Sequence, residues 1–167
     1  MDFKTLLPDF NAIGKTDWAK PDLKIDTKDT FKLVALAGAV LMLVFLFLSW
    51  TSITFNGTTG TKMGLATWYG IFALIMTLGA IVGILYNHNS LTFSCAVLAV
   101  VFGIIGICSI PDMTVAGTTF TSDQIKAAIK VNREAGKAVE VSHLGAILFT
   151  VASVVTAAGA YLKITKK

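Results

Sequence analysis

Four side chains carry most of the chemistry that this sequence could support: His88, His143, Cys95 and Cys108. Histidines bind metals and transfer protons, and paired cysteines form disulfides or redox centres. The histidines fall at opposite ends of apolar segments, so they cannot share a metal ion. The cysteines lie in one segment, where a helix would separate them by about 20 Å along its axis. We therefore expect no metal site, no cofactor and no disulfide.

Recognisable catalytic patterns are missing from the sequence. It contains no HExxH motif, no phosphate-binding glycine loop and no Ser/Lys pair. Its apolar segments also lack Asp, Glu, Lys and Arg, the residues that mark proton relays and ion paths inside a membrane. Asp112, Glu140 and His143 lie outside these segments, but their spacing matches no catalytic site. We expect no catalytic residues and no enzymatic activity.

Four apolar segments dominate the chain and must position everything else. Of 167 residues, 54% are hydrophobic and 14% are charged, and the mean hydropathy is +0.73. About 20 apolar residues cross a bilayer as a helix. The sequence predicts an all-α membrane protein, a four-transmembrane-helix bundle whose first partner is the lipid bilayer. The predicted spans are residues 33–50, 64–86, 91–110 and 144–162.

Basic residues predict how the chain is oriented. Nine lysines lie in segments 1–32 and 163–167, whereas the loops 51–63 and 111–143 hold five Lys and Arg and the tight turn 87–90 holds none. By the positive-inside rule both termini are cytoplasmic, in a plasma or inner membrane. Trp50, Trp68 and Tyr69 would then form an outer aromatic belt. The net charge of +4 is dispersed, so we expect no nucleic-acid partner.

The two longer loops each contain a hairpin signal. In loop 51–63, Asn56-Gly57 follows a β-branched and aromatic run. At an offset of 60 residues, Ala116-Gly117 occupies the same place in loop 111–143, with matching threonines on both sides. This favours two extracytoplasmic hairpins that pair into one small sheet, built by duplication of a helix–hairpin–helix unit; coincidence is the alternative.

Two further segments have amphipathic patterns. Apolar residues recur at helical spacing in residues 122–135, after a capping signal at Thr121 or Ser122 and before Gly136, which predicts an extra helix outside the membrane. Residues 1–32 carry a similar pattern that Pro8 interrupts, which predicts a short, broken helix on the cytoplasmic surface.

Small residues recur four apart in three of the spans and mark faces where helices can approach closely. Such faces serve either packing within one chain or an interface between copies. The candidate residues are Gly79 and Gly83, Ala99 and Gly103, and Ser153 and Ala157.

Trp50, followed by Gly64-Leu65-Ala66-Thr67-Trp68, resembles the Trp…Gly-Leu-Trp pattern of the claudin-type tetraspan proteins. The resemblance covers topology over most of the chain, but only Trp50, Gly64, Leu65 and Trp68 as motif; two residues intrude before Trp68, and the outer cysteine pair of that family is missing. It implies a structural or pore-forming assembly.

Two functions follow as hypotheses. The first is a non-catalytic membrane protein that acts by self-association or as a small subunit of a membrane complex. The second is an oligomeric channel for ions or small solutes. Its lining would come from hydroxyl side chains of the second and fourth spans: Thr67, Thr77, Thr150, Ser153 and Thr156.

Overall fold

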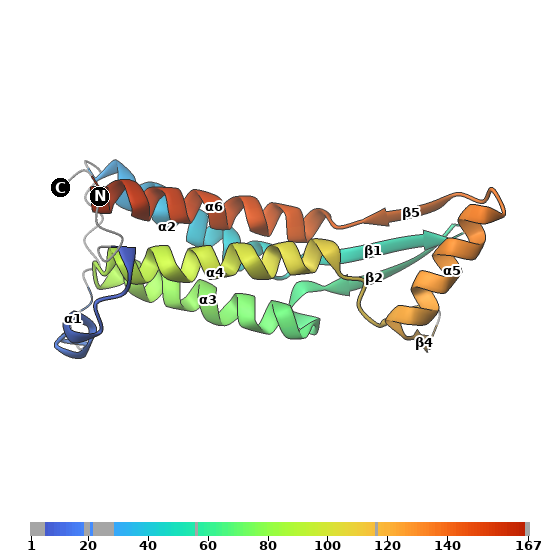
Figure 1. The fold of residues 1–167 in the computed structure, drawn as a ribbon, viewed down its shortest axis with the longest axis horizontal. Helices are drawn as coiled ribbons and strands as arrows, with labels where there is room; N and C mark the ends of the chain where they lie inside the picture. Colours follow the sequence, from blue (N-terminus) through green and yellow to red (C-terminus); the bar gives the residue numbers. More distant parts are fainter. Residues whose placement is uncertain (1–5, 19–20, 22–28, 56, 116, 166–167) are drawn as a thin grey trace.

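A computed structural model of the chain describes residues 6–18, 21, 29–55, 57–115 and 117–165. Four helices run side by side, and a smaller unit of strands and one helix extends from one end of the bundle (Figure 1). Helix α1 and the end of α6 lie at the opposite end of the molecule (Figure 1). The helices are α1 Phe10–Gly14, α2 Thr30–Phe45, α3 Trp68–Leu85, α4 Asn89–Cys108, α5 Ser122–Glu134 and α6 Leu144–Thr165.

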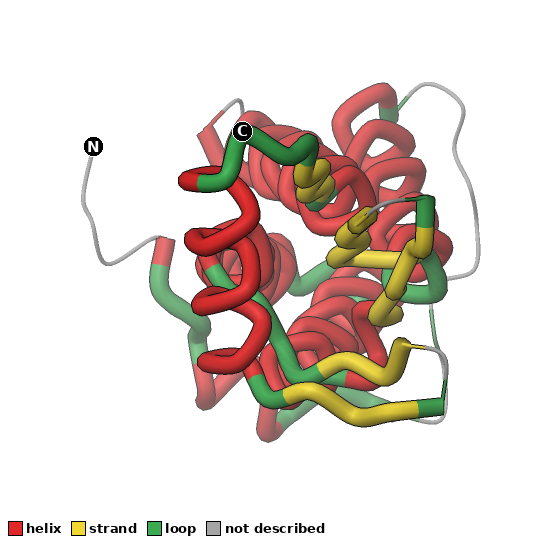
Figure 2. Tube along the Cα trace, turned by 90° about the vertical axis from the view of Figure 1, so that its right-hand side faces the viewer, coloured by secondary structure: helices red, strands yellow, loops and turns green. Residues whose placement is uncertain are grey.

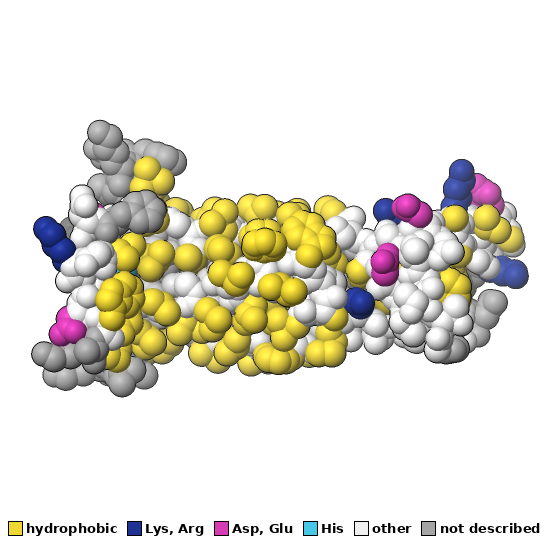
Figure 3. All heavy atoms as spheres, turned by 90° about the horizontal axis from the view of Figure 1, so that it is seen from below, with side chains coloured by type: hydrophobic (Ala, Val, Ile, Leu, Met, Phe, Trp, Pro, Cys, Tyr) yellow, Lys and Arg dark blue, Asp and Glu magenta, His cyan; other side chains and the backbone are white. Residues whose placement is uncertain are grey.

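The exterior of the bundle is apolar. Helices α3, α4 and α6 are long and apolar enough to cross a membrane, whereas α2 is apolar but has 16 residues. Large aliphatic side chains such as Val40, Ile75, Val101 and Val151 are about half exposed on its surface. On the face seen in Figure 3, hydrophobic side chains cover the middle of the molecule and charged side chains lie toward both ends. A membrane location is compatible with this surface.

Helix α2 ends earlier than the predicted span 33–50. After Phe45 the chain makes a tight turn, in which Phe47 N donates to Val44 O, and continues as a strand from Ser49. The indole Nε1 of Trp50 donates to the carbonyl of Phe45 at 3.0 Å. Carbonyls in the last turn of a helix lack intrahelical donors, so Trp50 satisfies one of them and fixes the helix end.

Two hairpins leave the bundle 60 residues apart in the sequence. Strand β1 (Ser49–Phe55) pairs with β2 (Thr58–Met63), and β3 (Met113–Val115) pairs with β4 (Thr118–Phe120), both antiparallel. Gly57 and Gly117 have φ angles of 81° and 82°. Equivalent threonine pairs bond across the strands, Thr54 with Thr59 at 2.9 Å and Thr114 with Thr119 at 3.0 Å. The two hairpins therefore share the conformation of this glycine and the threonine contact across the strands, while Asn56 and Ala116 lie outside the described residues.

The prediction that both hairpins join in one sheet is wrong. The free edge of β1 pairs instead with β5 (Val139–Ser142), which gives the order β2-β1-β5, while β3-β4 stays a separate sheet. The chain after α5 must return to α6 beside β1, so it takes this edge. The hairpins meet through side chains, and Gly60 leaves room for Val115.

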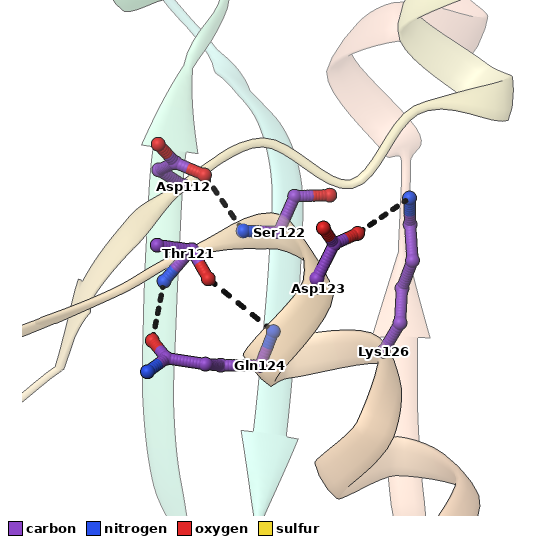
Figure 4. A network of polar contacts seen from close by, with 6 residues as sticks. All are labelled: Asp112, Thr121, Ser122, Asp123, Gln124 and Lys126. Carbon is purple, nitrogen blue, oxygen red and sulfur yellow. Dashed lines mark hydrogen bonds and ion pairs between the residues drawn. The ribbon is translucent and has the colours of Figure 1, made fainter.

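Strands β1 to β5 and helix α5 form what we term the head. Thr121 and Gln124 make a reciprocal capping box at the start of α5 (Figure 4). Ile125 and Ile129 of α5 are buried with Ile53 and Met113. Seen from the head end, α5 lies along one side of the strands (Figure 2). The sheet and α5 thus share a small apolar core outside the bundle.

Candidate functional site

The two histidines and two cysteines that could take part in chemistry do not form one site. His88 Nε2 lies 2.5 Å from Thr16 Oγ1 at one end of the bundle, and His143 Nδ1 lies 3.4 Å from Thr51 Oγ1 at the other. Cys95 and Cys108 are both free thiols. Within the described ranges, no three His, Cys, Asp or Glu side chains are close enough to hold a metal ion.

The hydroxyl groups suggested as a channel lining lie inside the single chain. Thr77, Ser153 and Thr156 are fully buried and donate to the carbonyl four residues earlier in their own helix. Thr150 makes the same bond, to Ala146, and Thr67 caps α3 through Gly70 N. Thr77, Ser153 and Thr156 are thus enclosed by the chain, whereas Thr150 is half-buried and Thr67 also borders a cleft at the end of the bundle.

Most of the small residues predicted as helix-packing positions are used within the chain. A Cβ on Gly79 would lie 2.8 Å from Cys95 Sγ, and one on Gly83 would lie 2.5 Å from Thr92 Oγ1, so both glycines face α4. Gly103 meets Thr150 of α6. Ala99 and Ser153 are fully buried, and Ala157 is half-buried.

Trp50 is the largest fully buried side chain of the described residues and belongs to the main apolar core, a role that the sequence does not predict. Trp50 is fully buried and packs on the rings of Tyr69 and Phe149 at centroid distances of 5.9 and 5.0 Å. Gly64, Gly106 and Gly145 leave the space that its ring occupies. The predicted outer belt is therefore wrong for Trp50 and Tyr69.

Of that predicted belt, only Trp68 is exposed, at 59%. The one signal for the central role of Trp50 was its position at the end of the apolar segment 33–50, ahead of Gly64. The two ends of the Trp…Gly-Leu-Trp resemblance thus differ, since Trp50 and Gly64 touch each other in the interior and Trp68 lies on the surface.

An apolar groove opens in the head between α5 and the strands. Its volume is about 230 Å³. Ile53 and Met113 form its buried floor, and Phe120, which is 39% exposed, lies at its edge. Its other lining residues are Phe55, Val115, Gln124, Ile125, Ala128 and Asn132. The groove can accept a bulky apolar group, and its amide side chains leave polar atoms at the rim.

Two charged groups outside the spans have perturbed titration. Asp29 caps α2 through Lys32 N and pairs with Lys163 of α6 at 2.7 Å. The hydrogen bond from Lys163 lowers the pKa of Asp29 below its usual value. Desolvation lowers the pKa of His143, against an opposing backbone hydrogen bond at Trp50. Asp29 joins the start of α2 to the end of α6, and His143, which precedes α6, contacts Thr51 of β1.

The fold and the site define a class: a helical bundle with an apolar exterior that carries a small strand-and-helix head with an open apolar groove. No family model matches the chain, and neither a curated protein nor a solved structure is significantly similar to it.

Proposed function

We propose that this protein is a non-catalytic, four-helix integral membrane protein that acts by association, as a small subunit of a membrane complex or with copies of itself. Both termini lie in the cytoplasm and the head lies outside. The lysine distribution supports this orientation, and α1 lies at the same end as the last turn of α6 (Figure 1). Helix α2 completes the set of four spans as the first of them in chain order, because the apolar turn after Phe45 extends its apolar length.

The observation that carries the proposal is the open groove of the head. Exposed apolar side chains are costly in water, and a cavity with such a lining is a common anchor point for a partner. A cavity of about 230 Å³ holds one large side chain. One side chain buries far less surface area than a complete protein–protein interface does. The groove is therefore the anchor for one bulky apolar residue, and lateral contacts between spans complete the interface.

Packing of the bundle supports the same choice of surface. Side chains from neighbouring helices of the same chain fill the space beside Gly79, Gly83 and Gly103. These positions are therefore closed to a second molecule. The resemblance to claudin-type proteins, which assemble through outer loops and helix sides, agrees with association through the head. Three of the five hydroxyl side chains suggested for a channel are fully buried within one chain, so we propose association in preference to an oligomeric channel.

The test compares two adjacent alanines of α5. Ala128 lines the groove, whereas Ala127 is exposed on another face of the helix. We expect Ala128→Trp to fill the groove and reduce the partner or second copy retained after extraction by about tenfold, the effect of losing one anchoring side chain. Ala127→Trp leaves retention unchanged. Native mass spectrometry of the extracted particle reads the partner's mass directly.

The masses also separate the two modes of association. A multiple of the chain mass means self-association, and an additional mass means a heteromeric complex. A particle that contains one chain and no partner, in wild type as well as in both variants, overturns the proposal.

A further inference from the structure

A second cavity lies where the head meets the bundle. This neck cleft has a volume of about 460 Å³. Its walls come from four elements: Lys62 from β2, Thr67 and Trp68 from the start of α3, Ser109 from the end of α4, and Lys126 from α5. In contrast to the groove, the neck cleft is lined on its head side by cationic and hydroxyl groups.

The ends of two helices place the neck cleft at one edge of the apolar band. Helix α3 begins at Trp68 and α4 ends at Cys108, so the cleft lies where the apolar band stops. Trp68 is 59% exposed beside it, the placement typical of a tryptophan at the headgroup level of a bilayer. In the membrane orientation proposed above, the neck cleft therefore opens among lipid headgroups, and this inference rests on that proposal.

The donors around the cleft suit an anion. Lys62 makes no ion pair among the described residues, and Lys126 has only a long contact of 3.9 Å with the exposed carboxylate of Asp123 (Figure 4). Such an exposed contact contributes little, so both ammonium groups can bind another anion. The positive end of the α3 dipole lies at the same place, although Thr67 already caps the Gly70 amide of this helix.

Two further observations bear on the polarity of the site. The carboxylate of Asp112 also lines the cleft, but it already accepts the Ser122 amide at 2.6 Å (Figure 4). Tyr69 also borders the cleft, but the residue is only 3% exposed and its hydroxyl is buried beside Thr67 and Thr51, so this hydroxyl is not presented to the cleft. Two lysines thus outnumber the one carboxylate that lines the cleft, and that carboxylate is already engaged.

We propose that the neck cleft binds a phosphate group, carried by a membrane phospholipid. A phosphate offers the multiple acceptor oxygens that two ammonium groups, hydroxyls and a helix start can satisfy together. The acyl chains of the lipid would follow the apolar band below Trp68. Free inorganic phosphate has the same chemistry without the chains, so the experiment separates these two sources.

The experiment measures lipid retained by the full chain in detergent, by native mass spectrometry. The probes are dioleoylphosphatidylglycerol, dioleoylglycerol without a phosphate, and inorganic phosphate. We compare K62Q/K126Q with K130Q/K137Q, which removes two lysines of the head that do not line the cleft. We expect wild type to retain the phospholipid and not dioleoylglycerol, and K62Q/K126Q to lose about tenfold in retention, with K130Q/K137Q unchanged.

Several outcomes decide the proposal. Retention of inorganic phosphate without retention of the phospholipid would keep the phosphate site and reject the lipid as its source. Equal losses in both double variants, or equal retention of dioleoylglycerol, overturn the site. A second variant, Ser109→Phe, narrows the cleft without changing charge and must also reduce retention. Resistance of each variant to carbonate extraction from membranes shows separately whether the chain is membrane-embedded, so failure of the neck cleft and failure of the proposed function are distinguishable.

Discussion

Gly106 of α4 and Trp50 of β1 lie so close that a Cβ on the glycine would be 2.7 Å from the indole Cε3 atom. The first residues of the head therefore fill a gap in the wall of the bundle. Trp50 also bonds the last turn of α2 and stacks on α3 through Tyr69. Because Trp50 also packs on Phe149 of α6, one side chain joins the head to four helices, and we expect its loss to destabilise the whole fold.

Trp50→Ala should destabilise the protein by about 3–5 kcal/mol, the usual cost of removing a buried aromatic side chain. Gly106→Ala should cost about 1–3 kcal/mol, because its methyl group overpacks the same site. Unfolding by denaturant titration in detergent, followed by near-ultraviolet circular dichroism, measures both. Trp68→Ala is the control, since that ring is 59% exposed; an equal loss there would contradict the central role of Trp50.

Gly103→Leu should lower the stability of the single chain by about 1–3 kcal/mol, because the new side chain collides with Thr150 of α6. The mass of the particle in detergent should not change. The matched control is Ala158→Leu, at an exposed position of α6. If Gly103→Leu instead changes the mass and leaves stability intact, this face is an interface between chains.

The Asp29–Lys163 pair should make stability depend on pH in the acid range. The pKa of Asp29 is lower in the folded than in the unfolded chain, so its contribution is complete above the unfolded value and is lost as pH falls through the lowered one. Asp29→Asn keeps a helix-capping oxygen but removes the charge, and should cost about 1 kcal/mol at neutral pH. Unfolding free energies between about pH 7 and pH 3 should fall less steeply in this variant.

A double-mutant cycle supplies the control for this pair. Lys163→Gln should cost as much as Asp29→Asn, and the double variant should cost no more than either alone. Additive losses would mean that the two residues act independently.

His143 should make stability depend on pH nearer neutrality. Desolvation lowers its pKa in the folded protein, so folding favours the neutral imidazole. Its contribution is complete above the unfolded value of about 6.5 and is lost as pH falls toward the folded one. Comparison of wild type with His143→Gln between about pH 7.5 and 5 should show a shallower decline in the variant. A decline of equal slope would place the titrating group elsewhere.

Much of the local structure follows from the sequence. Uncharged apolar runs can only be helices in a bilayer, because every backbone group must then be paired within the segment. Gly57 and Gly117, at positive φ, fix both turns, and the Thr121–Gln124 capping box fixes the start of α5. These features depend on neighbours within a few residues along the chain, so residue types and spacing are sufficient to predict them.

Tertiary structure decided where each side chain is buried. Trp50 and Tyr69 had the positions of interfacial aromatics, yet glycines on other segments leave space for Trp50 in the interior. Strand β5 takes the edge of β1 that the second hairpin was expected to fill, because the return to α6 brings it there. The groove and the neck cleft likewise join residues far apart in the chain. Apolar patterning gives each segment a preferred environment but no partner, and partners are chosen by the complementary shapes of packed surfaces.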